Sequence, residues 1–188
     1  MDKSQYIKVL KKKLADELKQ QTWLQDKAKW DSLPEHQPKK ITQLDIDENK
    51  ILSYCADNIE KGKFINNNLD HSMNWENTEG LHDAIGGSNI DKLPLKKDEL
   101  LIQVIVKFPR HGVLWHNDLY NQWHSDAEAV RYWFSVLDQH YGHFFQISNT
   151  SLQYNKGEVY MIPRGIGHCS ANSGFSPQVT CSITGVPI

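Results

Sequence analysis

Hydrophobic residues recur at two different periods along this chain of 188 residues. From Ser4 to about Leu24 they recur every three to four positions, which predicts an amphipathic helix with lysines on its opposite side. A second helix is predicted over residues 47–61, where Asp47 is a suitable N-cap and Gly62 a suitable stop. The expected inward positions of this helix are Ile51, Leu52, Cys55 and Ile59. We therefore expect the N-terminal third to be mostly helical.

The hydrophobic pattern changes in the second half of the chain. Residues 63–98 are rich in Asn, Asp, Gly and Ser, which predicts loops and one short helix. From Glu99 onward, β-branched and aromatic runs separated by Gly, Asn and Pro predict antiparallel strands. The runs are ELLIQVIVKF, VRYWFSVL, HFFQIS, SLQY, EVYMIP and QVTCSITGV. Their spacing indicates a sandwich or a jelly roll over residues 99–188, with residues 1–98 packed on this core in one structural domain.

Composition narrows the classes of partner. A formal net charge of -2 gives no global basic field, so nucleic acid is not expected as a partner. No apolar run is long enough for a membrane span, and the first residues lack the apolar segment of a signal peptide. Cys55, Cys169 and Cys181 are too scattered for a disulfide framework. These features predict a cytoplasmic protein without a membrane partner, in a reducing compartment that tolerates ferrous iron.

The segment VLWHNDLYNQW places a histidine and a carboxylate two positions apart. Because side chains alternate along a strand, His116 and Asp118 are expected on one side, where they can bind one metal ion. His168 follows a predicted strand ending at Pro163 and a tight Pro-Arg-Gly turn. Two imidazoles and one carboxylate form the facial triad of non-haem iron(II) oxygenases. A lone histidine is usually a hydrogen-bonded structural residue, and this interpretation applies to His111, His124, His140 and His143.

The segment from about residue 100 to the C-terminus resembles the double-stranded β-helix of the cupin superfamily. Within it, the segment resembles the iron(II) and 2-oxoglutarate dependent dioxygenases, whose HxD...H signature matches His116, Asp118 and His168. The stretch NKGEVYMIPRGIGH is similar to the one that precedes the last histidine of cupins. The resemblance implies a mainly β jelly roll with an N-terminal helical layer. It further implies Fe(II) at the triad, 2-oxoglutarate as cosubstrate and hydroxylation of an unactivated C–H bond.

The family usually binds the far carboxylate of 2-oxoglutarate with an arginine after the last histidine, followed two positions later by Ser or Thr. This chain has Gln178 and Thr180 at those positions. Because a neutral amide lacks the charge of a guanidinium, another cation is expected. Arg131, which leads an otherwise apolar strand, is the first candidate, and Arg164 is the second. The aspartyl/asparaginyl hydroxylase branch is similar in carrying an arginine on an early core strand. The alternative for Arg131 is a surface arginine or a structural ion pair.

Two other functional interpretations stay open at this point. One is a metal-dependent cupin enzyme that does not use 2-oxoglutarate, which the missing arginine favours, although most such cupins have HxH where this chain has HND. The other is a non-catalytic jelly-roll module that binds a ligand or another protein. For an enzyme, the expected partner is a small-molecule or peptide substrate. The sequence does not determine the oligomeric state.

Overall fold

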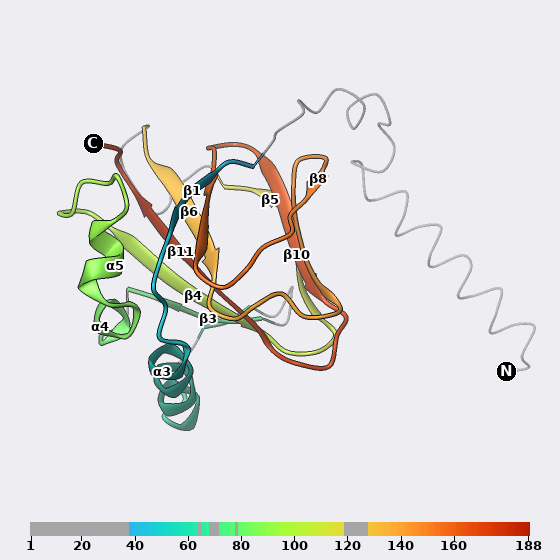
Figure 1. The fold of residues 1–188 in the computed structure, drawn as a ribbon. Helices are drawn as coiled ribbons and strands as arrows, with labels where there is room; N and C mark the ends of the chain where they lie inside the picture. Colours follow the sequence, from blue (N-terminus) through green and yellow to red (C-terminus); the bar gives the residue numbers. More distant parts are fainter. Residues whose placement is uncertain (1–37, 64, 68–71, 78, 119–127) are drawn as a thin grey trace, which may run out of the picture. The chain divides into compact units, whose positions relative to one another are not determined.

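Two antiparallel sheets form the framework of the described part of the chain (Figure 1). The computed structural model describes residues 38–63, 65–67, 72–77, 79–118 and 128–188, all within one unit, residues 36–188. The seven-stranded sheet has the order β1 (Lys40–Gln43), β9 (Glu158–Ile162), β6 (Val130–Ser135), β11 (Gln178–Gly185), β4 (Leu101–Lys107), β3 (Ser72–Glu76), β2 (Ile65–Asn67). The four-stranded sheet has the order β5 (His111–Asn117), β10 (Gly167–Asn172), β7 (His143–Ile147), β8 (Thr150–Ser151).

From β4 onward the chain alternates between the two sheets. Strands β4, β6, β9 and β11 belong to the larger sheet, while β5, β7 with β8, and β10 belong to the smaller one. This alternation is the connectivity of a double-stranded β-helix, so the predicted jelly-roll fold is confirmed. Of the predicted strand SLQY only Ser151 belongs to a strand, β8, although the Leu152 N–H still donates to the carbonyl of Phe145 on β7. Leu152 and Tyr154 pack into the apolar interior.

The prediction of loops for residues 63–98 is wrong in part, because strands β2 and β3 and helices α4 (Leu81–Ile85) and α5 (Gly87–Asp91) lie there. Strand β3 pairs with β4, with Trp75 opposite Val104. Trp75 is buried, and its indole N–H donates to the carbonyl of Lys63 at 2.6 Å. A short Asn-rich segment has a low intrinsic preference for strand, and here the pairing with β4 stabilises the strand. The larger sheet therefore extends across the expected boundary at residue 98.

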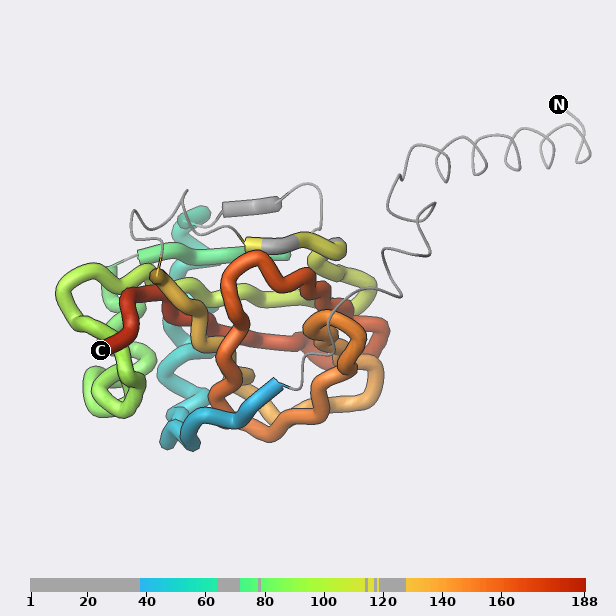
Figure 2. The backbone as a smooth tube through the Cα atoms, turned by 90° about the horizontal axis from the view of Figure 1, so that it is seen from above, coloured from blue at the N-terminus to red at the C-terminus, as the bar shows by residue number. Residues whose placement is uncertain are grey.

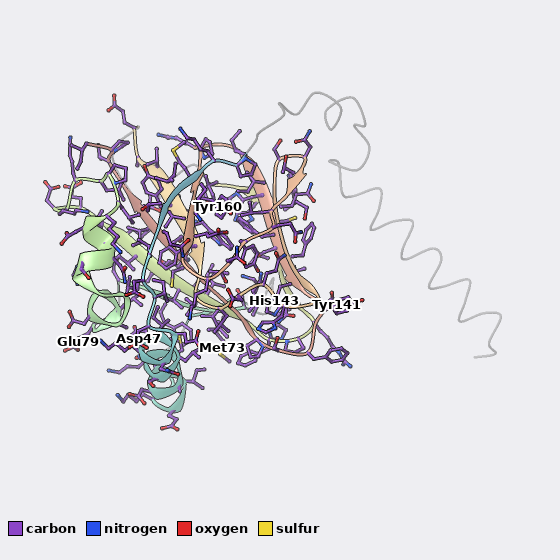
Figure 3. All side chains as sticks on the ribbon, in the orientation of Figure 1. Asp47, Met73, Glu79, Tyr141, His143 and Tyr160 are labelled. Atoms are coloured by element: carbon purple, nitrogen blue, oxygen red, sulfur yellow. The ribbon has the colours of Figure 1, made fainter. Side chains whose placement is uncertain are left out.

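The predicted second helix is confirmed as α3 (Glu48–Glu60). The Asp47 side chain accepts hydrogen bonds from the backbone N–H groups of Asn49 and Lys50, as its position at the start of the helix in Figure 3 allows. Gly62, just beyond the C-terminal end, has a left-handed φ of 65°. The predicted helix over residues 4–24 lies outside the described residues. Among the helices that the structure describes, none is long and apolar enough to cross a membrane.

The outer face of the larger sheet is apolar and is covered by helices. Alternate residues of β4, β6 and β11 form one core cluster with side chains of α3, α4 and α5. The sheet members of this cluster include Ile102, Val104, Val106, Phe134, Val179 and Ile183. In Figures 1 and 2 the three helices lie on one side of the strands. The intervening residues of the same strands consequently face the interior between the two sheets.

Candidate metal centre and its cavity

Two neighbouring strand ends bring the predicted metal ligands together. His116 is the penultimate residue of β5, Asp118 follows that strand, and His168 is the second residue of β10. Because β5 and β10 pair with His116 opposite His168, residues distant in sequence become neighbours. His116 Nε2 lies 3.7 Å from Asp118 Oδ1, and His168 Nε2 lies 3.5 Å from Asp118 Oδ2. One ligand atom from each residue lies within 4.8 Å of the others, a spacing suited to one cation.

The His168 imidazole is oriented by the turn that precedes β10. Its Nδ1 lies 3.1 Å from the carbonyl oxygen of Ile166, a contact that favours the proton on Nδ1 and leaves the Nε2 lone pair facing Asp118. Burial, together with the neighbouring His116 imidazole, lowers the pKa of His168 to about 4. His168 is therefore neutral at pH 7, which is the form that binds a metal ion.

Arg131, at the start of β6, contacts the same carboxylate. Its Nη1 lies 2.6 Å from Asp118 Oδ2, and its Nε–H donates to the hydroxyl of Thr184 at 3.0 Å. Both side chains of this ion pair are buried, with exposed fractions of 7% for Arg131 and 2% for Asp118. The structure thus brings Arg131 to the triad as an ion-pair partner of Asp118. A role for Arg131 in binding a cosubstrate stays a prediction.

The other residues predicted to bind the cosubstrate occupy different surroundings. Thr180 and Gln178 both lie on β11 and are buried. Thr180 lines the cavity beside the triad, whereas the side-chain amide of Gln178 donates to the Tyr154 hydroxyl at 2.7 Å. Arg164 is not among the described residues that line this cavity. Thr180 is therefore the member of this group that has access to a ligand at the triad.

The cavity beside the triad is small and has a polar lining from the larger sheet. Its volume is about 40 Å³, room for a few water molecules. The polar residues that line it are Gln103, Lys107, His116, Arg131, His168, Ser170, Thr180 and Ser182. Those on β4 and β11 alternate with the apolar residues of the outer core. Polar residues at every second position of a fully buried strand, as in QVTCSIT of β11, are the sequence signal for such a lining.

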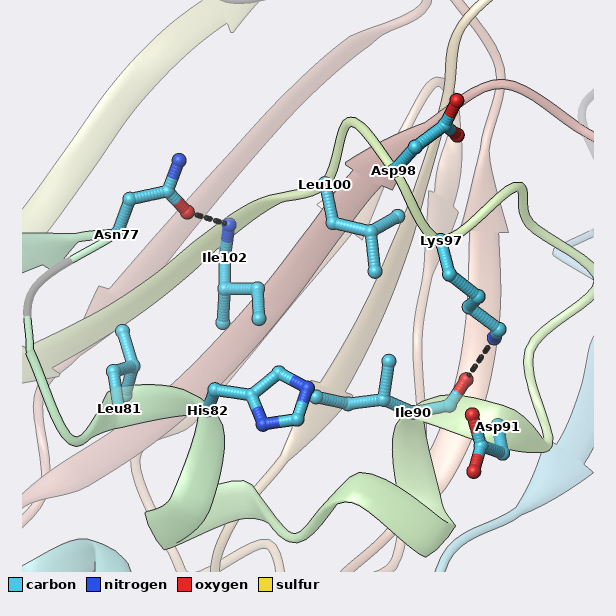
Figure 4. A pocket seen from close by; sticks show the side chains of 9 residues that line it. All are labelled: Asn77, Leu81, His82, Ile90, Asp91, Lys97, Asp98, Leu100 and Ile102. Carbon is cyan, nitrogen blue, oxygen red and sulfur yellow. Dashed lines mark hydrogen bonds between the residues drawn. The ribbon is translucent and has the colours of Figure 1, made fainter.

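A larger hollow of about 340 Å³ lies beside α4, α5 and the start of β4 (Figure 4). Two of its polar side chains, those of Lys97 and Asn77, bind backbone atoms. The Lys97 ammonium donates to the carbonyls of Ile90 and Leu93, and the Asn77 carbonyl oxygen accepts from the Ile102 N–H at 2.7 Å. These contacts cap a helix end and join a loop to a strand. Lys97 and Asn77 therefore have structural roles in this hollow.

His143 has the structural role expected for a histidine outside the triad. Its Nδ1 accepts from the His140 backbone N–H at 3.3 Å, and its Nε2 lies 3.0 Å from the carbonyl oxygen of Ser176. Both ring nitrogens are satisfied in the neutral form. Burial lowers the pKa of His143, in agreement with that form. His124 lies outside the described residues.

The metal-free protein is expected to lose stability as pH falls from about 6.5 to about 4. The pKa of His168 drops from 6.5 to about 4 on folding, so in this range the unfolded chain binds a proton that the folded chain does not. Lowering the pH therefore decreases the free energy of unfolding, and His143 contributes with the same sign. Urea unfolding at pH 7 and pH 5 with a chelator measures the effect. His168→Gln should reduce the dependence, and an equal dependence in both proteins would contradict it.

Comparisons with known proteins support the fold. Neither a protein-family model nor a curated protein matches the sequence. A prolyl-4-hydroxylase from Pseudomonas putida is similar in structure, with a TM-score of 0.58 at 9% identity over 84% of this chain and 96% of that chain. The cupin domain of Schizosaccharomyces pombe Cnp3 is also similar, with a TM-score of 0.41 at 8% identity over 61% of each chain. At such identities the likeness concerns the fold alone, which is a double-stranded β-helix, or jelly roll.

Proposed function

We propose that the protein is a non-haem iron(II) and 2-oxoglutarate dependent oxygenase that hydroxylates a C–H bond of a small-molecule or peptide substrate. The observation that carries this proposal is the convergence of His116, Asp118 and His168 at two paired strand ends of a double-stranded β-helix. The fold of the prolyl-4-hydroxylase from Pseudomonas putida, which this chain resembles, supports it.

The donor set fits ferrous iron. Two imidazoles and one carboxylate bind iron on one side and leave positions for other ligands. Iron and 2-oxoglutarate, when bound, would supply the activated oxygen for hydroxylation. His116, Asp118 and His168 would hold the metal, and the Ile166 carbonyl would keep His168 oriented.

The residues around the triad protect and shape the site. Arg131 orients the Asp118 carboxylate and offsets its buried charge. The Asp118 and His168 side chains are 2% and 5% exposed, whereas that of His116 is 38% exposed, so ligands enter on the side of His116. Trp133 and Phe145 stack at 4.2 Å between ring centroids and form an apolar wall of the cavity. An apolar wall of this kind would limit the access of water on that side of the reacting centre.

A metal-dependent cupin enzyme that does not use 2-oxoglutarate is the second candidate. The observation in its favour is that Gln178 occupies the position of the usual arginine, while Arg131 is bound to Asp118. Such an enzyme would share the metal centre and differ in its organic ligand.

Spectroscopy under anaerobic conditions distinguishes these functions. The protein loaded with Fe(II) is expected to develop a weak visible charge-transfer band when 2-oxoglutarate is added. Iron uptake without this band would contradict the use of 2-oxoglutarate and favour the second candidate. No uptake of iron would contradict both enzymes and favour a non-catalytic binding module.

A further inference from the structure

We propose that the substrate carries a guanidinium group, which Glu76 and Asn74 on β3 bind beside the metal centre. The inference rests on the proposed function and names the class of substrate for the same site. The carboxylate of Glu76 supplies the negative charge, and the side-chain oxygen of Asn74 supplies a second acceptor. Both residues belong to a strand in a segment where the sequence predicts loops.

The first argument is the face of β3 on which these two side chains lie. Met73 and Trp75 pack into the outer core cluster. Because side chains alternate along a strand, Asn74 and Glu76 lie on the other face, toward the interior between the two sheets. The Gln103 side chain, which lines the cavity beside the triad, donates from its amide to Glu76 Oε1 at 2.8 Å. Glu76 therefore shares the face of the larger sheet that forms the cavity wall.

The second argument is the register of the larger sheet. Trp133, Ser182 and Gln103 are paired across β6, β11 and β4, and all three line the cavity. Glu76 is the next member of this row, directly opposite Gln103. Neighbouring strands are about 4.8 Å apart, so Glu76 lies one strand beyond the cavity wall.

Asn74 occupies the equivalent place in the neighbouring row. It lies opposite Ile105, which in turn lies opposite Thr180, and both Ile105 and Thr180 line the cavity. Asn74 Oδ1 is buried and has no hydrogen-bond partner among the described residues. A buried amide oxygen without a donor is costly, and a ligand that donates to this oxygen removes the cost.

The third argument is the charge of Glu76. The Gln103 amide is fixed at both ends, because its oxygen accepts from the Ser182 hydroxyl at 3.3 Å while its N–H donates to Glu76. This neutral donor positions the carboxylate without offsetting its negative charge. Among the described residues, no lysine or arginine forms an ion pair with Glu76. A cationic ligand would supply the missing charge through a charge-assisted hydrogen bond.

The fourth argument is the approach to the metal centre. Strand β3 lies next to β5, the strand that carries His116, and His116 is the exposed member of the triad. A substrate that enters on the side of His116 therefore meets the face of β3 that carries Asn74 and Glu76. A guanidinium has five N–H donors in one plane, so it can donate to a carboxylate and to an amide oxygen together.

Calorimetry with two ligands of nearly equal shape tests this inference. The full chain, loaded with Fe(II) and 2-oxoglutarate without oxygen, is titrated with N-acetylarginine amide and with N-acetylcitrulline amide, in which a neutral urea replaces the guanidinium. The parent protein is expected to bind the arginine derivative about 10- to 100-fold more tightly, the range of charge-assisted hydrogen bonds. Glu76→Gln should remove this preference and take up iron as before. Glu79→Gln, at an exposed position three residues further on, should keep the preference.

Each outcome separates this inference from the proposed function. Equal affinity for the two derivatives, no binding of either, or a preference that persists in Glu76→Gln would overturn the inference, while iron uptake leaves the proposed function standing. If iron is not taken up, the proposed function fails, and the same titrations of the metal-free chain decide for Glu76 by the same criteria.

A measurement on the parent protein replaces the variant if Glu76→Gln does not fold, as judged by thermal unfolding. The backbone N–H signals of Asn74 and Glu76 in the nuclear magnetic resonance spectrum of the metal-free chain should shift when the arginine derivative is added. The signal of Glu79 should stay in place. Unshifted signals of Asn74 and Glu76 would overturn the inference.

Discussion

Arg131→Met is expected to destabilise the metal-free protein by about 3–5 kcal/mol, the cost of leaving a buried charge without its partner. Asp118 is 2% exposed and lies 2.6 Å from the Arg131 guanidinium. Methionine fills a similar volume but leaves the carboxylate uncompensated in the interior. The free energy of unfolding, measured in urea at pH 7 with a chelator, checks this value.

A double-mutant cycle attributes the loss to the ion pair. Asp118→Asn in the Arg131→Met background removes the unpaired charge and should restore much of the stability. Divalent metal should also stabilise Arg131→Met more than it stabilises the parent protein, because the cation offsets the charge of Asp118. Additive losses in the cycle would show that Arg131 acts through packing alone and not through the carboxylate.

His168→Ala is expected to lower the affinity for ferrous iron by more than about 100-fold. Loss of a residue that only hydrogen-bonds to a metal ligand already lowers metal affinity by about 10- to 100-fold, and His168 is itself a proposed ligand. The imidazole is 5% exposed and is oriented toward Asp118 by the Ile166 carbonyl, so its removal takes away a preorganised ligand. Competition with a chromophoric chelator under anaerobic conditions measures the affinity.

The control for this variant is another histidine of the same jelly roll. His140 is exposed, and His140→Ala should bind iron as the parent protein does. Circular dichroism should show that both variants retain their β structure. Iron affinity equal in His168→Ala and His140→Ala would exclude a metal centre at His116, Asp118 and His168.

The elements with strong periodic patterns could be predicted from residue types and their spacing. Helix α3 begins after the Asp47 cap and ends shortly before Gly62 as expected, because capping and left-handed glycine are local properties. The strands β4, β6, β9 and β11 likewise follow their apolar runs. The HxD pair could be predicted because residues two positions apart in an extended segment point to the same side, although Asp118 lies just beyond the end of β5.

Other features depend on contacts between segments that are far apart in sequence. Strand β3 exists through its pairing with β4, and nothing in SMNWE alone requires it. From the sequence, Arg131 could bind the cosubstrate or form a structural ion pair. Only the fold shows that its guanidinium contacts Asp118. Lys107 is the last residue of β4, and its residue type alone does not indicate a buried position. Only the pairing of β4 with β11 places it opposite Gln178. The spacing of residues in the sequence therefore shows which side chains of one strand share a face. The register between strands decides which side chains of different strands come into contact, because it pairs residues that are far apart in sequence.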